Sequence, residues 1–130
     1  MYVLHFPTDP YLRPFMEMNI KKYSEIRLRI GLDEQNTPTE IVWEADDDGK
    51  EGHPCKALLL SLFDEQRRDT VKIDLWTTQM QVNEMDRFFF QTLRGLADTY
   101  FRATKNQELA TQMQQFVQFF GEQTKILSKE

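Results

Sequence analysis

The chain has few of the residues that most catalytic and metal-binding sites need. Its 130 residues include one cysteine, Cys55, and two histidines, His5 and His53. A single cysteine cannot form a disulfide within the chain, so nothing in the sequence asks for an oxidising compartment. No CxxC or HExxH pattern and no second Cys/His pair is present. We therefore expect no catalytic residue, no metal site and no cofactor, and we expect that the chain is not an enzyme.

Long apolar runs are also missing from the sequence. The longest, residues 57–60 and 88–90, fall far short of the ~20 residues that a bilayer-crossing helix needs. The start of the chain has no basic segment and is broken by prolines at positions 7, 10 and 14, which does not fit a signal peptide. These absences predict a soluble, cytoplasmic protein with no direct membrane insertion.

Positive residues are outnumbered by negative ones, 16 against 21, and are not gathered in a stripe. The net charge is -5, and residues 33–54 hold eight acidic residues and one lysine, which leaves a net +2 for the rest. Without a basic surface we expect no nucleic-acid binding. The acidic run at residues 46–48 does not fit a calcium-binding loop, because the closing position is Ala57 rather than a glutamate. We interpret the run as a solvated loop, with weak calcium binding as the alternative.

Three segments alternate between apolar and polar residues, as half-buried strands do. They are residues 24–32, 40–45 and 70–77. A polar turn containing Asn36 and Pro38 separates the first two, so the sequence predicts that they form a hairpin. The spacing does not decide whether the third strand is parallel or antiparallel to the second.

Three other segments have the spacing of amphipathic helices. Residues 54–66 place Cys55 and several leucines on one face after Pro54, and so predict a short helix. A long helix is expected over residues 83–103, capped by Asn83, and a second over residues 107–127, capped by Asn106.

Together these segments predict a two-layer α+β fold. It has a three-stranded, mainly antiparallel sheet, one short crossover helix and two long C-terminal helices on one face. Residues 1–23 are expected to form an irregular N-terminal arm, because prolines interrupt helix and central strand. Residues 24–130 are expected to form a single α+β domain.

The long helices carry more aromatic residues than one packing face needs. Phe90 and Phe101 lie to one side of the main apolar stripe, and Phe119 is off the stripe of the last helix. Trp76 falls on the polar side of its strand. We therefore take Trp76, Phe90, Phe101 and Phe119 as a candidate interaction surface.

Two alternatives compete with this interpretation. The helices could pack against each other with these aromatic residues, and the arm could fold over Trp76 with its own aromatic residues, which are Tyr2, Phe6, Tyr11 and Phe15.

The sequence also resembles the gliding-motility protein C (GldC) family over approximately residues 24–120. The likeness is carried by DLWT at residues 74–77 and by the residue groups 84–85, 88–89, 91–93, 97–99 and 102–104, with support from residues 30–34 and 57–61. The arm has no counterpart in the family. The resemblance implies an accessory protein of bacterial surface gliding that works through contacts with other proteins, and it assigns no functional residues.

Two hypotheses of function follow. The first is a non-catalytic accessory protein whose partners are other proteins, either components of the gliding apparatus or a second copy of the chain. The alternative is a small apolar-ligand or client-peptide binding domain of a chaperone-like kind. Its site would lie between sheet and helices, with an adaptable lining of Met80, Met85 and Met113.

Overall fold

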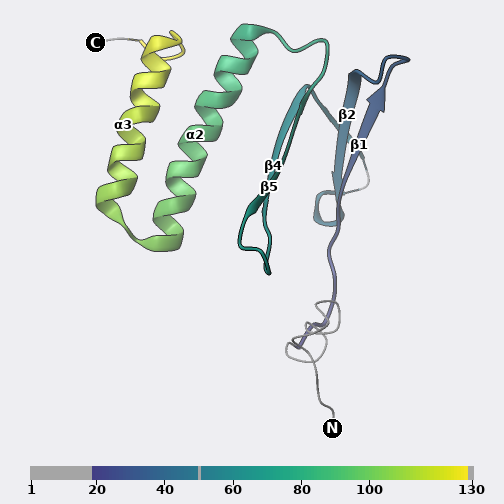
Figure 1. Ribbon diagram of the computed structural model, residues 1–130, viewed down its shortest axis with the longest axis horizontal. Coiled ribbons are helices and arrows are strands. Elements are labelled where there is room, and N and C mark those ends of the chain that lie inside the picture. The colour runs from purple at the N-terminus through teal and green to yellow at the C-terminus, as the bar shows by residue number, and fades with distance from the viewer. Residues whose placement is uncertain (1–18, 50, 129–130) are drawn as a thin grey trace. The chain divides into compact units, whose positions relative to one another are not determined.

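The computed structural model describes residues 19–49 and 51–128, and it divides the chain into two compact units (Figure 1). The first unit ends at Cys55 and the second begins at Lys56. Residues 19–25 contain no helix or strand, and the rest of the predicted arm lies outside the described residues. The single domain expected over residues 24–130 stays a prediction.

The first unit contains a three-stranded antiparallel sheet of order β1-β2-β3. Its strands are β1 (Ile26–Leu32), β2 (Pro38–Ala45) and β3 (His53–Cys55). The predicted β1–β2 hairpin is confirmed. Its turn is closed by Asp33, whose Oδ1 accepts the backbone N–H of Gln35 at 2.8 Å and of Thr37 at 3.0 Å. Asn36 takes the left-handed φ of 62° that asparagine tolerates better than most residues.

One face of this sheet is apolar, as alternation predicts. Ile26 lies opposite Ala45, Leu28 opposite Trp43 and Ile30 opposite Ile41. Ile41 is the largest side chain that is fully buried among the described residues. The apolar face of this unit is therefore built around the central strand, where Ile41 has neighbours on both sides.

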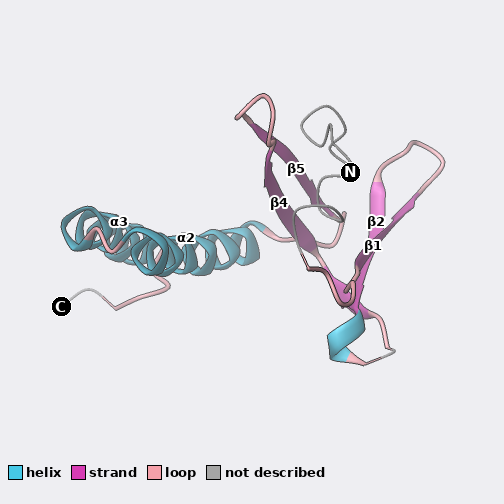
Figure 2. Cartoon of the chain, turned by 90° about the horizontal axis from the view of Figure 1, so that it is seen from below, coloured by secondary structure: helices cyan, strands magenta, loops and turns pink. Residues whose placement is uncertain are grey.

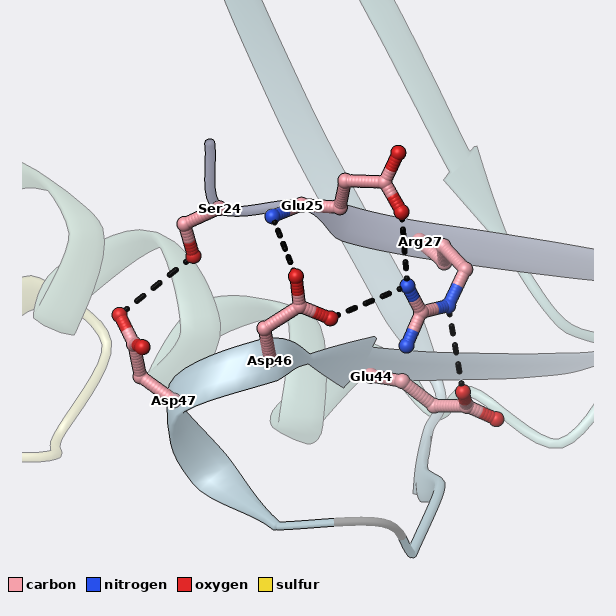
Figure 3. Close-up of polar contacts among 6 residues, drawn as sticks. All are labelled: Ser24, Glu25, Arg27, Glu44, Asp46 and Asp47. Carbon is pink, nitrogen blue, oxygen red and sulfur yellow. Dashed lines mark hydrogen bonds and ion pairs between the residues drawn. The ribbon is translucent and has the colours of Figure 1, made fainter. Parts of the chain in front are cut away.

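The polar side of the first unit is organised by Arg27 (Figure 3). Its guanidinium lies 3.2 Å from Asp46 Oδ1 and donates from Nε to Glu44 Oε2 at 3.4 Å. These two hydrogen bonds, the Asp46 bond first, raise the pKa of Arg27 above its ordinary value. Asp46 begins the short 3-10 helix η2 (Asp46–Asp48) and also accepts the N–H of Glu25 at 3.0 Å. The start of the acidic run is thus tied to β1.

The helix predicted over residues 54–66 is wrong. This stretch forms β3 and then β4 (Ala57–Phe63). A short run of leucines fits a strand as well as a helix, and the pattern alone could not separate them. The strand has a cross-strand partner that the helix would lack, because Leu58, Leu60 and Leu62 face apolar residues of the next strand. Pro54 fits as well, since β3 is an edge strand.

The third predicted strand is confirmed as β5 (Thr70–Trp76), but its partner differs from the expected one. It pairs antiparallel with β4 in a separate two-stranded sheet, matching Leu75 with Leu58, Ile73 with Leu60 and Val71 with Leu62. The single three-stranded sheet with a crossover helix is therefore corrected to sheets of three and two strands. The α+β class and the antiparallel pairing hold.

Both long helices are present and run antiparallel side by side (Figures 1 and 2). They are α2 (Val82–Thr104) and α3 (Gln107–Gln123). The cap predicted at Asn106 is confirmed, since its side chain accepts the N–H of Leu109 at 3.1 Å. Helix α2 begins earlier than predicted, with Gln81 rather than Asn83 as the cap. Helix α3 ends before residue 127 because Lys125 takes a left-handed φ of 65°.

The seam between the helices holds the main core of the second unit. Four apolar side chains in it are buried, and they are Phe90, Ala97, Ala110 and Val117. Small residues at two of these positions let the helices approach closely. The helical hairpin is thus held by a narrow central stripe of each helix.

Candidate functional site

The connection between β5 and α2 fixes where the long helix begins. The N–H of Thr77 donates to the carbonyl of Lys56 at 2.8 Å, and the Thr77 carbonyl accepts the N–H of Met80 at 3.1 Å. The buried Thr77 hydroxyl accepts the N–H of Gln79 at 3.3 Å. Because every one of these bonds involves Thr77, that residue anchors the turn on Lys56, the residue that directly precedes β4.

A side-chain ion pair also stabilises this connection between β5 and α2. Lys56 Nζ donates to Glu84 Oε2 at 2.7 Å, and Glu84 Oε1 accepts the N–H of Gln81 at 3.1 Å. These hydrogen bonds, the Lys56 bond first, lower the pKa of Glu84 below its ordinary value of 4.5. Glu84 also completes the capping box that starts α2. The base of the β4–β5 hairpin is therefore joined to the first turn of α2.

A small cavity opens between these joined elements, and we name it the Trp76 cleft. Its volume is about 80 Å³. Most of its lining is apolar, and the lining residues are Ala57, Leu59, Lys72, Asp74, Leu75, Trp76, Met85, Phe88 and Phe89. Lys72 Nζ and Asp74 Oδ2 pair at 2.8 Å, so the two charges in the lining are mutually compensated. The cleft is thus an apolar recess with an ion pair in its wall.

Trp76 is the most exposed large apolar side chain of the cleft, with 56% of its surface accessible. Alternation predicts that it shares a face with Lys72 and Asp74, and all three do line the same cleft. The competing interpretation, in which the aromatic residues of the arm cover Trp76, falls on residues outside the described part of the chain.

The other three candidate residues are placed differently. Phe90 is only 4% exposed and lies in the seam between the helices, so it is not available to a partner. Phe101 is half-buried, with Lys105 Nζ 5.6 Å from its ring centre. Phe119 is 54% exposed on α3. The alternative of helix-to-helix packing therefore accounts for Phe90, whereas Trp76 and Phe119 are accessible surface.

A second, larger depression lies along the helical hairpin. It has a volume of about 470 Å³ and is lined by Phe90, Arg94, Asp98, Gln114, Val117, Gln118 and Leu127. Four of these seven lining residues are polar or charged, so its walls are mixed, whereas the ligand-binding alternative requires predominantly apolar walls. Of the three methionines suggested for such a lining, Met85 borders the Trp76 cleft, and neither Met80 nor Met113 borders either cavity.

His53 and Cys55 lie in β3, two residues apart and therefore on one face of that strand. Cys55 is opposite Ile41, and the ring of His53 lies 4.7 Å from that of Trp43. In residues 19–49 and 51–128, no group of three or more His, Cys, Asp or Glu side chains could hold a metal ion. Within the same ranges no helix is both long and apolar enough to cross a membrane.

Comparison with known protein families shows to which family the chain is related. A family described as gliding motility-associated protein GldC-like matches residues 38–126. The chain belongs to this family. The match confirms the resemblance, although it begins and ends later than residues 24–120. No curated protein and no solved structure matches the chain.

The matched range contains a surface that sequence reasoning missed in this GldC-like chain. Six aliphatic residues lie on one face of the β4–β5 hairpin, as three cross-strand pairs. Leu62, Val71 and Ile73 of this face are exposed. The signal was available in the alternation of residues 58, 60 and 62, but assigning that stretch to a helix hid it. The side of the hairpin away from Trp76 is thus also apolar.

Proposed function

We propose that the chain is a non-catalytic accessory protein of gliding motility, working in the cytoplasm, that binds another protein through the Trp76 cleft. Membership of the GldC-like family supports the link to gliding motility. The exposure of Trp76 beside an apolar recess supports a contact role, because exposed tryptophans next to a pocket are frequent anchors of protein interfaces.

The size of the cleft separates this proposal from the ligand-binding alternative. Sites for drug-sized ligands usually measure roughly 300–1,000 Å³. The cleft, at about 80 Å³, has room for about one aliphatic side chain. A partner that places a leucine- or methionine-sized group in the recess, and packs its own surface on Trp76, would use both features.

The wall of the cleft adds a requirement on the partner. Lys72 and Asp74 already compensate each other at 2.8 Å, so an incoming charged group would have to compete with an existing ion pair. An apolar or uncharged polar surface meets no such competition. We therefore expect the partner to present an uncharged contact to this site.

The first experiment compares Trp76→Ala with Phe119→Ala in the native host. The two side chains are similarly exposed, at 56% and 54%, but only Trp76 lines the cleft. Each variant, confirmed to be folded by circular dichroism, replaces the wild-type gene. Movement of cells over a surface is scored, and co-purifying proteins are identified by mass spectrometry.

We expect Trp76→Ala to lose at least one partner and to impair gliding, while Phe119→Ala retains both. Normal gliding of cells that carry Trp76→Ala would contradict the proposal. Stabilisation of the purified chain by small apolar molecules, in a thermal-shift screen, would favour the ligand-binding alternative instead.

A further inference from the structure

The helical hairpin has two sides of opposite character. Arg94 and Asp98 of α2 and Gln114 and Gln118 of α3 edge one depression and so lie on the same side. Each helix also carries a row of four apolar residues, spaced four, three and four positions apart in sequence. This row lies on the other side of the buried seam. The helices run antiparallel (Figure 1). In this arrangement the two rows, which have the same rotational offset from the seam on each helix, come to the same side of the hairpin.

We call this second surface the hairpin face. Its eight residues are Phe89, Leu93, Leu96 and Tyr100 of α2 and Leu109, Met113, Phe116 and Phe120 of α3. Four of them are well exposed: Phe89 at 39%, Leu96 at 53%, Leu109 at 43% and Phe116 at 52%. The hairpin therefore leaves a continuous apolar row of each helix open, although its own seam is already filled.

The area of the hairpin face matches what a stable dimer uses. With about 200 Å² for each fully exposed side chain of this size, the exposed fractions amount to roughly 500 Å² of apolar surface. A standard interface buries about 800 Å² on each partner, and about 65% of a homodimer interface is apolar, which is again roughly 500 Å². The face is also at the upper end of the apolar patches that monomers normally expose, roughly 300–600 Å².

The absence of charge on the hairpin face favours a second copy of the chain as its partner. None of the eight residues is charged, whereas Arg94 and Asp98 lie on the opposite side of α2. In a twofold symmetric interface each patch meets its own copy, so a charged patch would meet like charge. An uncharged apolar face avoids that repulsion and is complementary to itself.

We propose that the hairpin face binds the same face of a second copy. The result is a twofold symmetric dimer in which the two helical hairpins pack face to face. The dimer goes beyond the proposed function, because it requires no other protein. Phe89 belongs to the hairpin face and also lines the Trp76 cleft, whereas Leu96 and Phe116 do not line the cleft. It gives the eight apolar side chains the burial that the isolated hairpin does not provide.

The test begins with the unaltered full-length chain. Light scattering coupled to size exclusion should give twice the mass of the 15.5 kDa chain, and the melting temperature should rise with protein concentration. A mass of 15.5 kDa at every concentration would overturn the proposal, whether another protein or the rest of the chain covers the face.

Two charge substitutions then locate the interface. Leu96→Glu and Phe116→Glu place a carboxylate in the centre of the hairpin face, and each should weaken the dimer by at least about 100-fold, since a buried unpaired charge is costly. Gln114→Glu makes a comparable change on the polar side and should leave the mass doubled.

The substitutions also detect a dimer that forms through a different surface. If Leu96→Glu and Phe116→Glu both keep the doubled mass, the hairpin face is not the interface and the proposal fails. Should either variant unfold, hydrogen exchange of the wild-type chain at low and high concentration replaces it. Protection that grows with concentration at residues 89–100 and 109–120 supports the proposal, and unchanged protection there refutes it.

Discussion

Gly121 of α3 lies so close to Phe90 of α2 that a methyl group at position 121 would come within 2.7 Å of Phe90 Cε1. The same methyl group would lie 2.6 Å from Leu127 Cδ1. Gly121 therefore lets the ring of Phe90 reach the backbone of α3. This contact seals one end of the seam between the two helices.

Gly121→Ala should destabilise the chain. Forcing a methyl group into this packed contact costs typically about 1–3 kcal/mol. Gly95→Ala is the matched control, because nothing lies within 4 Å of its added methyl group. At that exposed helical position alanine should instead stabilise by up to about 1 kcal/mol. Urea unfolding of the two variants measures the difference, and equal stabilities would show that the Gly121 contact is not tight.

Phe90→Ala and Phe119→Ala should differ strongly in the free energy of unfolding. Phe90 is 4% exposed, and truncating a buried phenylalanine costs about 3–5 kcal/mol. Phe119 is 54% exposed, and we expect a cost below about 1 kcal/mol. Denaturant unfolding followed by circular dichroism gives both values. Comparable losses would mean that Phe119 is buried in the protein as it exists in solution.

Asn106→Ala should weaken the start of α3. The side chain of Asn106 accepts the N–H of Leu109 at 3.1 Å, and losing such a cap costs about 1 kcal/mol. Gln112→Ala, an exposed change within the same helix, should stay within about 0.5 kcal/mol of wild type. Thermal unfolding of the pair tests this, and an unaffected Asn106→Ala would argue against the cap.

Glu84→Gln should destabilise the chain at neutral pH but not in acid. The lowered pKa of Glu84 means that its ionised form is favoured by folding, with the Lys56 bond as the largest cause. Its contribution is complete above the ordinary value of 4.5 and is lost as the pH falls through the lower folded pKa. Glutamine keeps an acceptor for the capping box but no charge.

The measurement for Glu84 is urea unfolding of wild type and variant across this pH range, with the two curves converging in acid. Lys56→Met is the companion change, because it removes the first cause of the shift. An NMR titration should then find the pKa of Glu84 closer to its ordinary value. A stability difference that persists below the folded pKa would rule out the ion pair as its source.

Local pattern was enough for much of the fold. Alternation located β1, β2 and β5, and the cap at Asn106 was correct because an asparagine side chain satisfies helix N–H groups without help from the rest of the chain. The cap predicted at Asn83 for the start of α2 was wrong. Gln81 rather than Asn83 is the N-cap, because Gln81 and Glu84 form a capping box in which the side chain of each bonds the backbone of the other.

The leucine run at residues 58–60 shows where local pattern no longer decides the structure. Its alternation and its helical spacing are both satisfied by the same leucines, so periodicity could not choose between them. The choice fell to β5, whose Val71, Ile73 and Leu75 provide cross-strand partners. The candidate site had the same limit, since Phe90 and Phe119 are both off-stripe aromatics in sequence and only packing made one buried and the other exposed.

The sequence by itself determined the α+β class, the two long helices and the family, because these depend on local periodicity and on residue identity. Tertiary structure alone decided that β5 pairs with β4, that Trp76 borders an apolar recess, and that the two helices leave one face uncovered. The physical reason is that burial depends on which surfaces meet. A stripe along one helix or strand says which residues can be buried, and only the partner of that stripe determines which of them are.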